Sequence, residues 1–137
     1  MEDLLFSLKG ATAKALTRRS MIKSLEPVRV FAEFKAPERI GVLRSNIKIS
    51  SKAKPRARKR SDVEVYVGPD RSVRQAIPQE FGTIKHSPSP YMRPAWDAKK
   101  FEVLVTFEGE MWDQLYTAIE RQERKIARDA EKLKRAR

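Results

Sequence analysis

Residues 47–68 read IKISSKAKPRARKRSDVEVYVG, and this stretch decides the fold class. Apolar and polar residues alternate at both of its ends, which is the pattern of half-buried strands. The alternating apolar residues are Ile47, Ile49, Val63, Val65 and Val67. Between them lies KAKPRARKR, residues 52–60, which contains a proline and no acid and is typical of a solvated loop. The stretch therefore predicts a β-hairpin with a long basic tip.

The basic tip is the strongest electrostatic feature of the sequence. Its cations are Lys52, Lys54, Arg56, Arg58, Lys59 and Arg60. A tip of this kind could contact DNA phosphates, which would make binding dependent on salt and independent of sequence. It could equally dock on an acidic protein face or serve solubility alone, and the sequence leaves these alternatives open. No aromatic residue stands among the cations, so base stacking is not indicated.

On the N-terminal side of the hairpin, the chain up to about Lys35 shows helical periodicity. The apolar residues that recur at three- and four-residue steps are Leu16, Ile22, Leu25, Val28, Phe31 and Ala32. Pro27 interrupts this stripe because its ring removes a backbone hydrogen bond. We expect either a kink there or two helices, with Pro27 in the first turn of the second. Pro37 and Gly41 predict that the helix ends near Ala36.

On the C-terminal side, residues 69–94 are rich in Pro, Ser and Gly. They predict a short helix over residues 73–80, then a loop, then the start of a further helix near Met92. Trp96 and Trp112 are expected to be core or interface anchors.

The last part of the chain is its longest periodic segment and predicts a long helix. The members of its apolar stripe are Phe101, Leu104, Val105, Trp112, Leu115, Ile119, Ile126 and Leu133. FEVLVTF, residues 101–107, is rich in β-formers and also fits a strand. Helix is favoured because the stripe runs through it in phase. Apolar residues thin out after about Arg121, so residues 121–137 are expected to form a charged helical C-terminal extension, solvated or dependent on a partner.

Length and composition set the broad class. The 137 residues fit one domain, and with 40% hydrophobic and 35% charged residues the core should be modest, so neighbouring subunits are expected to add stability. The predicted fold is α+β: a small antiparallel sheet with a long basic hairpin, packed against an N-terminal helix and a long C-terminal helix. The net charge of +12 suggests an anionic partner such as DNA, RNA or an acidic protein, although it could also only keep the protein soluble.

Several classes of chemistry are disfavoured by the sequence. The absence of cysteine excludes disulfides, thiolate zinc sites and a cysteine nucleophile. No apolar run approaches the ~20 residues of a membrane helix, and MEDLLFSLKG carries acids where a signal peptide would be basic, so we expect a soluble, non-secreted protein without a membrane partner.

No catalytic constellation is evident either. The single histidine, His86, lies in a Ser/Pro-rich loop, and no phosphate-binding, HExxH or calcium-loop spacing occurs. We therefore expect no catalytic residue, no cofactor, no metal site and no enzymatic activity. Arg93 is a candidate for a buried ion pair or a helix cap, and Glu80 is its possible partner because both lie in the irregular region.

Three segments in a fixed order carry a family resemblance. They are APERIGVLRSNI at residues 36–47, QEFGT at residues 79–83 and SPYMRPAWDA at residues 89–98. In this order, with a helix before and a helix after, they resemble the phage tail-component family of long-tailed, siphovirus-type phages. The matching positions are Pro37, Gly41, Leu43, Arg44, Glu80, Phe81, Gly82, Thr83, Pro90, Arg93 and Pro94. Ile40 departs from the family's usual threonine and Gln79 from its usual apolar residue, and the basic tip is longer and more basic than expected.

The resemblance implies a tail-completion or head–tail joining (neck) protein with an α+β fold. It also implies a ring, expected to be a hexamer, around the channel that DNA crosses. The implied partners are other copies of the chain, adjacent neck and tail proteins, and genomic DNA. The implied location is the virion, with the host cytoplasm during assembly. The alternatives are a stand-alone, sequence-independent nucleic-acid-binding protein, which the basic tip would suit, and an enzyme such as a nuclease, which would need a metal-binding carboxylate cluster.

Overall fold

The computed structural model describes residues 10–37, 41–51 and 63–135. Its elements are α2 (Gly10–Ser24), α3 (Glu26–Lys35), α4 (Val42–Ser45), β1 (Ile47–Ser50), β2 (Tyr66–Pro69), α5 (Ala76–Phe81) and α6 (Met92–Arg135). The predicted α+β class is confirmed, with a two-stranded antiparallel sheet, N-terminal helices and a long C-terminal helix. The basic tip lies outside the described residues, so its conformation stays a prediction.

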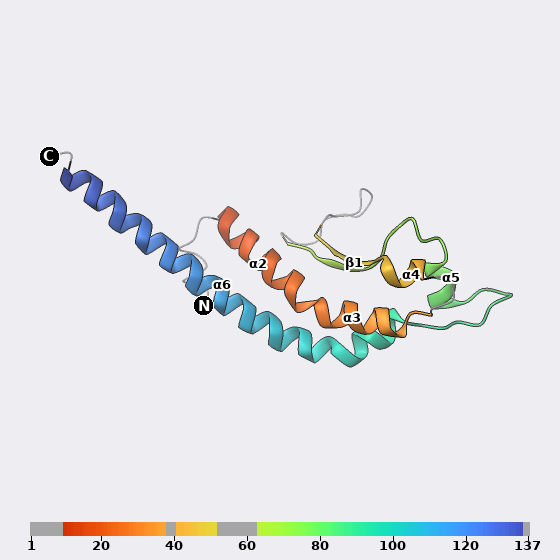
Figure 1. Cartoon of the computed structure of the whole chain (residues 1–137). Coiled ribbons are helices and arrows are strands. Elements are labelled where there is room, and N and C mark those ends of the chain that lie inside the picture. The colour runs from red at the N-terminus through yellow and green to blue at the C-terminus, as the bar shows by residue number, and fades with distance from the viewer. Residues whose placement is uncertain (1–9, 38–40, 52–62, 136–137) are drawn as a thin grey trace.

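Helix α3 is the centre of the fold (Figure 1). On one side α2 and α3 lie alongside α6, which runs in the opposite direction, and on the other side α3 contacts both strands and α4. The main core lies between these layers, at Val28, Ala32, Ala36, Leu43, Ile47, Val73, Ala76, Tyr91, Ala95 and Val103. A second, smaller cluster joins α2 to α6 through Leu16, Met111 and Leu115. The C-terminal part of α6 extends beyond both clusters.

Pro27 divides the N-terminal segment into two helices, as one of the two expectations had it. It lies in the first turn of α3, where the missing N–H is not needed. Helical hydrogen bonds still cross the junction, from Leu25 N to Met21 O at 3.2 Å and from Arg29 N to Leu25 O at 3.1 Å. α3 ends at Lys35, and Ala36 is extended, as the residue before a proline prefers.

The sheet pairs Ile47 with Pro69 and Ser50 with Tyr66. The first strand is confirmed, but the prediction that the second strand includes Val63 and Val65 is wrong. Among the described residues the pairing ends at Ser50 and Tyr66, and residues 63–65 are not in a strand. Val67 is the predicted valine that lies in the strand and packs against the main core.

The short helix is shorter than expected. It was predicted over residues 73–80, but α5 begins at Ala76, because Val73 packs into the core from a turn that precedes the helix. α5 ends at Phe81, since Gly82 adopts a φ of +77° that a helix cannot continue.

α6 is helical through residues 101–107, so the choice of helix over strand is confirmed. The residues that α6 buries are Ala95, Val103, Met111 and Leu115. Of the predicted stripe, Leu115 is buried and two members are half-buried, whereas Phe101, Leu104, Val105, Ile126 and Leu133 are exposed. α6 thus has two apolar faces, and the bulkier one faces away from the core. The smaller Ala95 and Val103 occupy the face that packs against the main core.

Candidate functional site

Glu80 connects the second family-like segment, residues 79–83, to the third, residues 89–98. It is the last but one residue of α5 and is 5% exposed. Its carboxylate accepts hydrogen bonds from the backbone N–H groups of Tyr91 (2.8 Å), Met92 (3.0 Å) and Arg93 (3.1 Å). These donors lie in the first turn of α6, where no helical acceptor is available. Glu80 therefore caps α6 from a different element and fixes where the long helix starts.

The side chain of Arg93 closes this arrangement from outside. Its Nε donates to Glu80 Oε1 at 3.1 Å, and its Nη2 donates to the Glu80 backbone carbonyl at 3.0 Å. Its guanidinium also lies 4.9 Å from the ring centre of Phe81. The expected Glu80–Arg93 pair is thus present, but with the roles exchanged. Arg93 is largely exposed, and Glu80 is the buried member and the helix cap.

The capping bonds set the acidity of Glu80. Burial alone would raise the pKa of Glu80, but the N–H groups of Met92, Tyr91 and Arg93, together with the Arg93 side chain, outweigh it and lower the pKa below 4.5. For Tyr91, burial and then the charge of Glu80 raise the pKa to about 12. At neutral pH the junction therefore consists of a charged Glu80 beside a neutral tyrosine.

This pKa shift predicts a loss of stability in acid. Because the pKa of Glu80 is lower in the folded than in the unfolded chain, its contribution is present above about pH 4.5 and is lost as the pH falls below that value. Urea unfolding of the wild type and of Glu80→Gln should show a difference in free energy of unfolding that shrinks between pH 6 and pH 3, values chosen around the ordinary carboxyl pKa. Glu26→Gln is the matched control, since the pKa of Glu26 is also lowered, chiefly by its hydrogen bond to Arg29, but its side chain is half exposed. A difference between wild type and Glu80→Gln that does not change with pH would contradict the role of the charge.

Gly82 and Thr83, which follow Phe81, begin a tight loop. Thr83 N donates to His86 O at 2.8 Å and His86 N returns a bond to Thr83 O at 3.2 Å, while Ser89 N donates to Gln79 O at 2.9 Å. A Cβ at Gly82 would lie 2.9 Å from both Cδ and N of Pro88. His86 thus contributes its backbone to the loop that carries the chain from α5 to α6, whereas Pro90 is exposed just before the junction.

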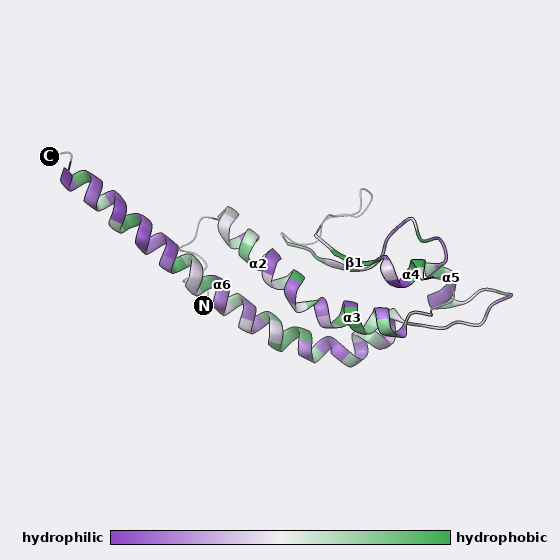
Figure 2. Cartoon of the chain, viewed as in Figure 1, coloured by the Kyte–Doolittle hydropathy of each residue, from purple (hydrophilic) through white to green (hydrophobic). Residues whose placement is uncertain are grey.

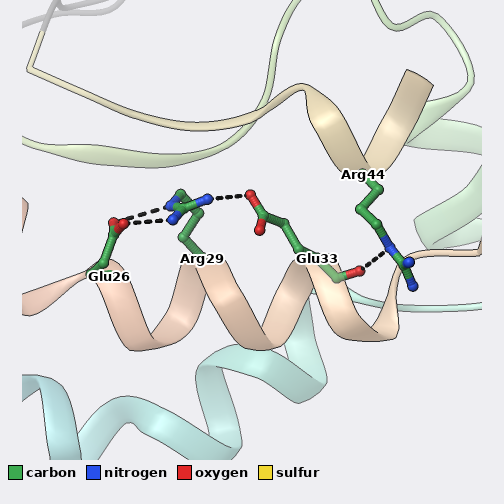
Figure 3. A network of polar contacts seen from close by, with 4 residues as sticks. All are labelled: Glu26, Arg29, Glu33 and Arg44. Atoms are coloured by element: carbon green, nitrogen blue, oxygen red, sulfur yellow. Dashed lines mark hydrogen bonds and ion pairs between the residues drawn. The ribbon is translucent and has the colours of Figure 1, made fainter. Parts of the chain in front are cut away.

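The first family-like segment caps a different helix (Figure 3). Arg44, on α4, donates from Nε to the backbone carbonyl of Glu33 at 2.8 Å. Its Nη2 lies 3.5 Å from the carbonyl of Phe34. Both carbonyls belong to the last turn of α3 and have no helical donor of their own. Gly41, with a φ of +32°, precedes α4, and Leu43 anchors α4 in the main core.

Arg29 extends this polar surface along α3. It bonds to Glu26 and to Glu33, one turn away on either side. No local pattern predicts the capping role of Arg44, because its acceptors lie ten and eleven residues earlier in the chain. The family-like segments therefore fix the ends of α3 and α6 and define how these helices meet the rest of the fold.

Within residues 10–37, 41–51 and 63–135, no group of three or more His, Asp or Glu side chains could hold a metal ion. In this same part of the chain, no helix combines the length and the apolar character needed to span a membrane. The six cations of the basic tip lie outside the described ranges.

Hydrophobic residues recur between hydrophilic ones along the whole length of α6 (Figure 2). The clearest exposed feature is formed by eight of them, which we call the outer stripe: Phe101, Leu104, Val105, Trp112, Tyr116, Ile119, Ile126 and Leu133. All of them are exposed except Trp112 and Ile119, which are half-buried. Phe101 and Val105 are each 72% exposed, and the rings of Trp112 and Tyr116 stack at 5.9 Å. Trp112 also packs against the second cluster, so it partly meets the expectation of an anchor, whereas Trp96 is 47% exposed.

The outer stripe follows a seven-residue period. The residues that keep this period are Val105, Trp112, Ile119, Ile126 and Leu133. A helix with an apolar residue at every seventh position keeps that side toward a partner helix if the two coil slightly around each other. The outer stripe is therefore suited to docking rather than to solvent, and it is the candidate functional surface of the fold.

Comparison with known proteins adds no relative, since the chain matches no protein-family profile, no curated protein and no solved structure. The functional interpretation thus depends on the residues of this chain alone.

Proposed function

We propose that this protein is a structural subunit of a phage virion that assembles with copies of itself into a ring, expected to be a hexamer. The ring stands at the head–tail junction or at the head-proximal end of the tail. There it completes the tail and joins it to the head, and DNA passes through its channel. The subunit contacts adjacent neck and tail proteins and catalyses no reaction. The order of the three family-like segments supports this proposal.

The outer stripe is the structural observation that carries the proposal. Neighbours in a ring contact each other through two different surfaces of the same chain. The outer stripe supplies a long apolar surface, and exposed apolar side chains on other elements supply candidates for the second. These are Val30 and Phe34 on α3, and Ile77 and Phe81 on α5. A monomer rarely exposes so much apolar side-chain surface without a partner.

Removing apolar side chains from the outer stripe should abolish the ring. In Phe101→Ser/Leu104→Ser/Val105→Ser, the lost burial of about 1.5 kcal/mol per side chain should weaken each contact roughly a thousandfold. The monomer fold should persist, because all three side chains are exposed. Native mass spectrometry should show a symmetric ring for the wild type and monomers for the variant, with helicity checked by circular dichroism.

The matched control places three serines on the opposite side of the same helix, as Arg128→Ser/Lys132→Ser/Arg135→Ser. This control should still form rings. A wild-type chain that stays monomeric at tens of micromolar, a concentration far above the Kd of a stable interface, would overturn the ring. If that monomer also bound duplex DNA tightly, the stand-alone nucleic-acid-binding protein would replace the ring subunit as the function.

A further inference from the structure

The charges of α6 are divided between its two halves. From residue 101 to 120 the helix has no cation, and its acids are Glu102, Glu108, Glu110, Asp113 and Glu120. From residue 121 to 135 it carries seven cations against three acids. The basic half is the part of α6 in which every residue is exposed, and it extends beyond α2 (Figure 1).

Six of the seven cations share one side of the helix. We call them the cationic stripe: Arg121, Arg124, Lys125, Arg128, Lys132 and Arg135. Their steps of three and four residues place them within an arc of about 100°, since each residue turns the helix by about 100°. Ile126 and Leu133, which belong to the outer stripe, lie on the opposite side. The basic half thus presents an apolar side, which can contact a protein partner, and a cationic side, which can bind an anion at the same time.

The cations of the stripe are available for an external anion. Arg124 pairs with Glu120 and Arg135 with Glu131, and both pairs are well exposed, so they contribute little stability and can exchange readily. Among the described residues, no carboxylate pairs with the other four. Arg121, Arg124 and Arg128 border a shallow hollow beside Ala127. Arginine is well suited to phosphate, because one guanidinium can bind it through two parallel hydrogen bonds.

The composition of the basic half favours one kind of anion. It contains no aromatic residue, which argues against single strands held by base stacking. Its large apolar residues are only Ile126 and Leu133, too few for a helix that inserts into a lipid surface. The stripe extends over about 21 Å, a length along which duplex DNA presents many phosphates. We propose that the cationic stripe binds the phosphate backbone of duplex DNA.

This inference deepens the proposed function, on which it rests for the identity of the ligand. Of the two places in the sequence where cations are concentrated, the basic tip and the C-terminal helix, it assigns the DNA contact to the helix. Because the cations lie along one side of a single helix, they form a row that one duplex can contact. A contact of this kind holds a passing duplex by charge without recognising its sequence.

The test is DNA binding by the full chain, measured by fluorescence anisotropy with a labelled mixed-sequence duplex over a range of salt concentrations. The variant Arg121→Gln/Lys125→Gln/Arg128→Gln/Lys132→Gln removes four stripe cations and keeps good helix formers. Affinity should fall roughly a hundredfold, and the magnitude of the negative slope of log K against log salt should decrease by about 3.6, since each of the four lost phosphate contacts lowers it by about 0.9. The control Arg18→Gln/Arg19→Gln/Arg71→Gln/Arg74→Gln removes the same charge from exposed positions elsewhere and should change affinity less than about threefold.

Three outcomes would overturn the proposal: no DNA binding by the wild type, equal losses in the two variants, or a stripe variant that binds like the wild type. The last outcome, combined with loss of binding when the six cations of the basic tip become serine, would assign the contact to the tip. Native mass spectrometry of the stripe variant separates the two proposals. If the wild type forms a ring but does not bind DNA, this inference alone is overturned. If the wild type binds DNA as a monomer, the ring alone is overturned.

Discussion

Replacing Glu80 with alanine is expected to lower the free energy of unfolding by roughly 3–5 kcal/mol. The change removes the acceptor of three backbone N–H groups at the start of α6, in a place where the buried carboxylate cannot be replaced freely by water. It also leaves Arg93 without its carboxylate partner. Thermal unfolding followed by circular dichroism should show a decrease in Tm of roughly 10–15 °C.

Arg93→Ala is the matched control at the other end of the same ion pair. Since the Arg93 side chain is largely exposed, its loss should cost only about 1 kcal/mol. Glu80→Gln should lie between the two, because an amide retains one acceptor oxygen. If Arg93→Ala were as damaging as Glu80→Ala, the ion pair would be more important than the helix cap, contrary to our assignment.

Gly82→Ala is expected to destabilise the fold by about 3 kcal/mol, for two reasons that act together. The φ of +77° and ψ of 176° at this position belong to a region that side chains with a Cβ hardly enter. In addition, the new Cβ would lie 2.9 Å from the ring and the backbone nitrogen of Pro88, which cannot move away without shifting the loop. Because the loop leads to the capped end of α6, the damage should reach the Glu80 junction.

Gly41→Ala separates these two reasons. Gly41 also has a positive φ, of +32°, but no atom of the residues that the structure describes lies within 4 Å of the position of its Cβ. We expect a cost of about 1 kcal/mol there, from the backbone alone. Urea unfolding of both variants provides the comparison. Equal free energies of unfolding for the two would show that the contact with Pro88 has no energetic weight.

The fold could be predicted from the sequence where a local rule decides the outcome. Pro27 marks a helix start because of its own ring, and the alternation of Ile47 with Ile49 marks a strand because of the period of the backbone. The side of α6 that meets the core could not be predicted in this way. It depends on how closely α2 and α3 approach, and Ala95 and Val103 give less signal in the sequence than the bulkier Phe101 and Leu104.

The candidate sites also combine features that a local pattern predicts with features that depend on tertiary packing. The proximity of Glu80 and Arg93 followed from their shared irregular region, but which of them is buried depends on the packing around Tyr91. The family resemblance singles out Arg44, but its capping of α3 could not be predicted, since donor and acceptors belong to different elements. The cationic stripe, in contrast, corresponds to a local pattern, the three- and four-residue spacing of its cations along a helix.

The Glu80 cap has a consequence for the far end of the molecule. With 44 residues, α6 is about 66 Å long; Glu80 fixes where it starts, and the packing of Val103, Met111 and Leu115 against α3 and α2 holds its direction as far as Leu115. A rotation of only about 5° at the Glu80 end would displace the other end by about 6 Å, which exceeds one helical turn. In the proposed ring, the accuracy with which subunits bring their cationic ends to a common axis would therefore depend on how firmly the Glu80 cap and this packing hold the helix.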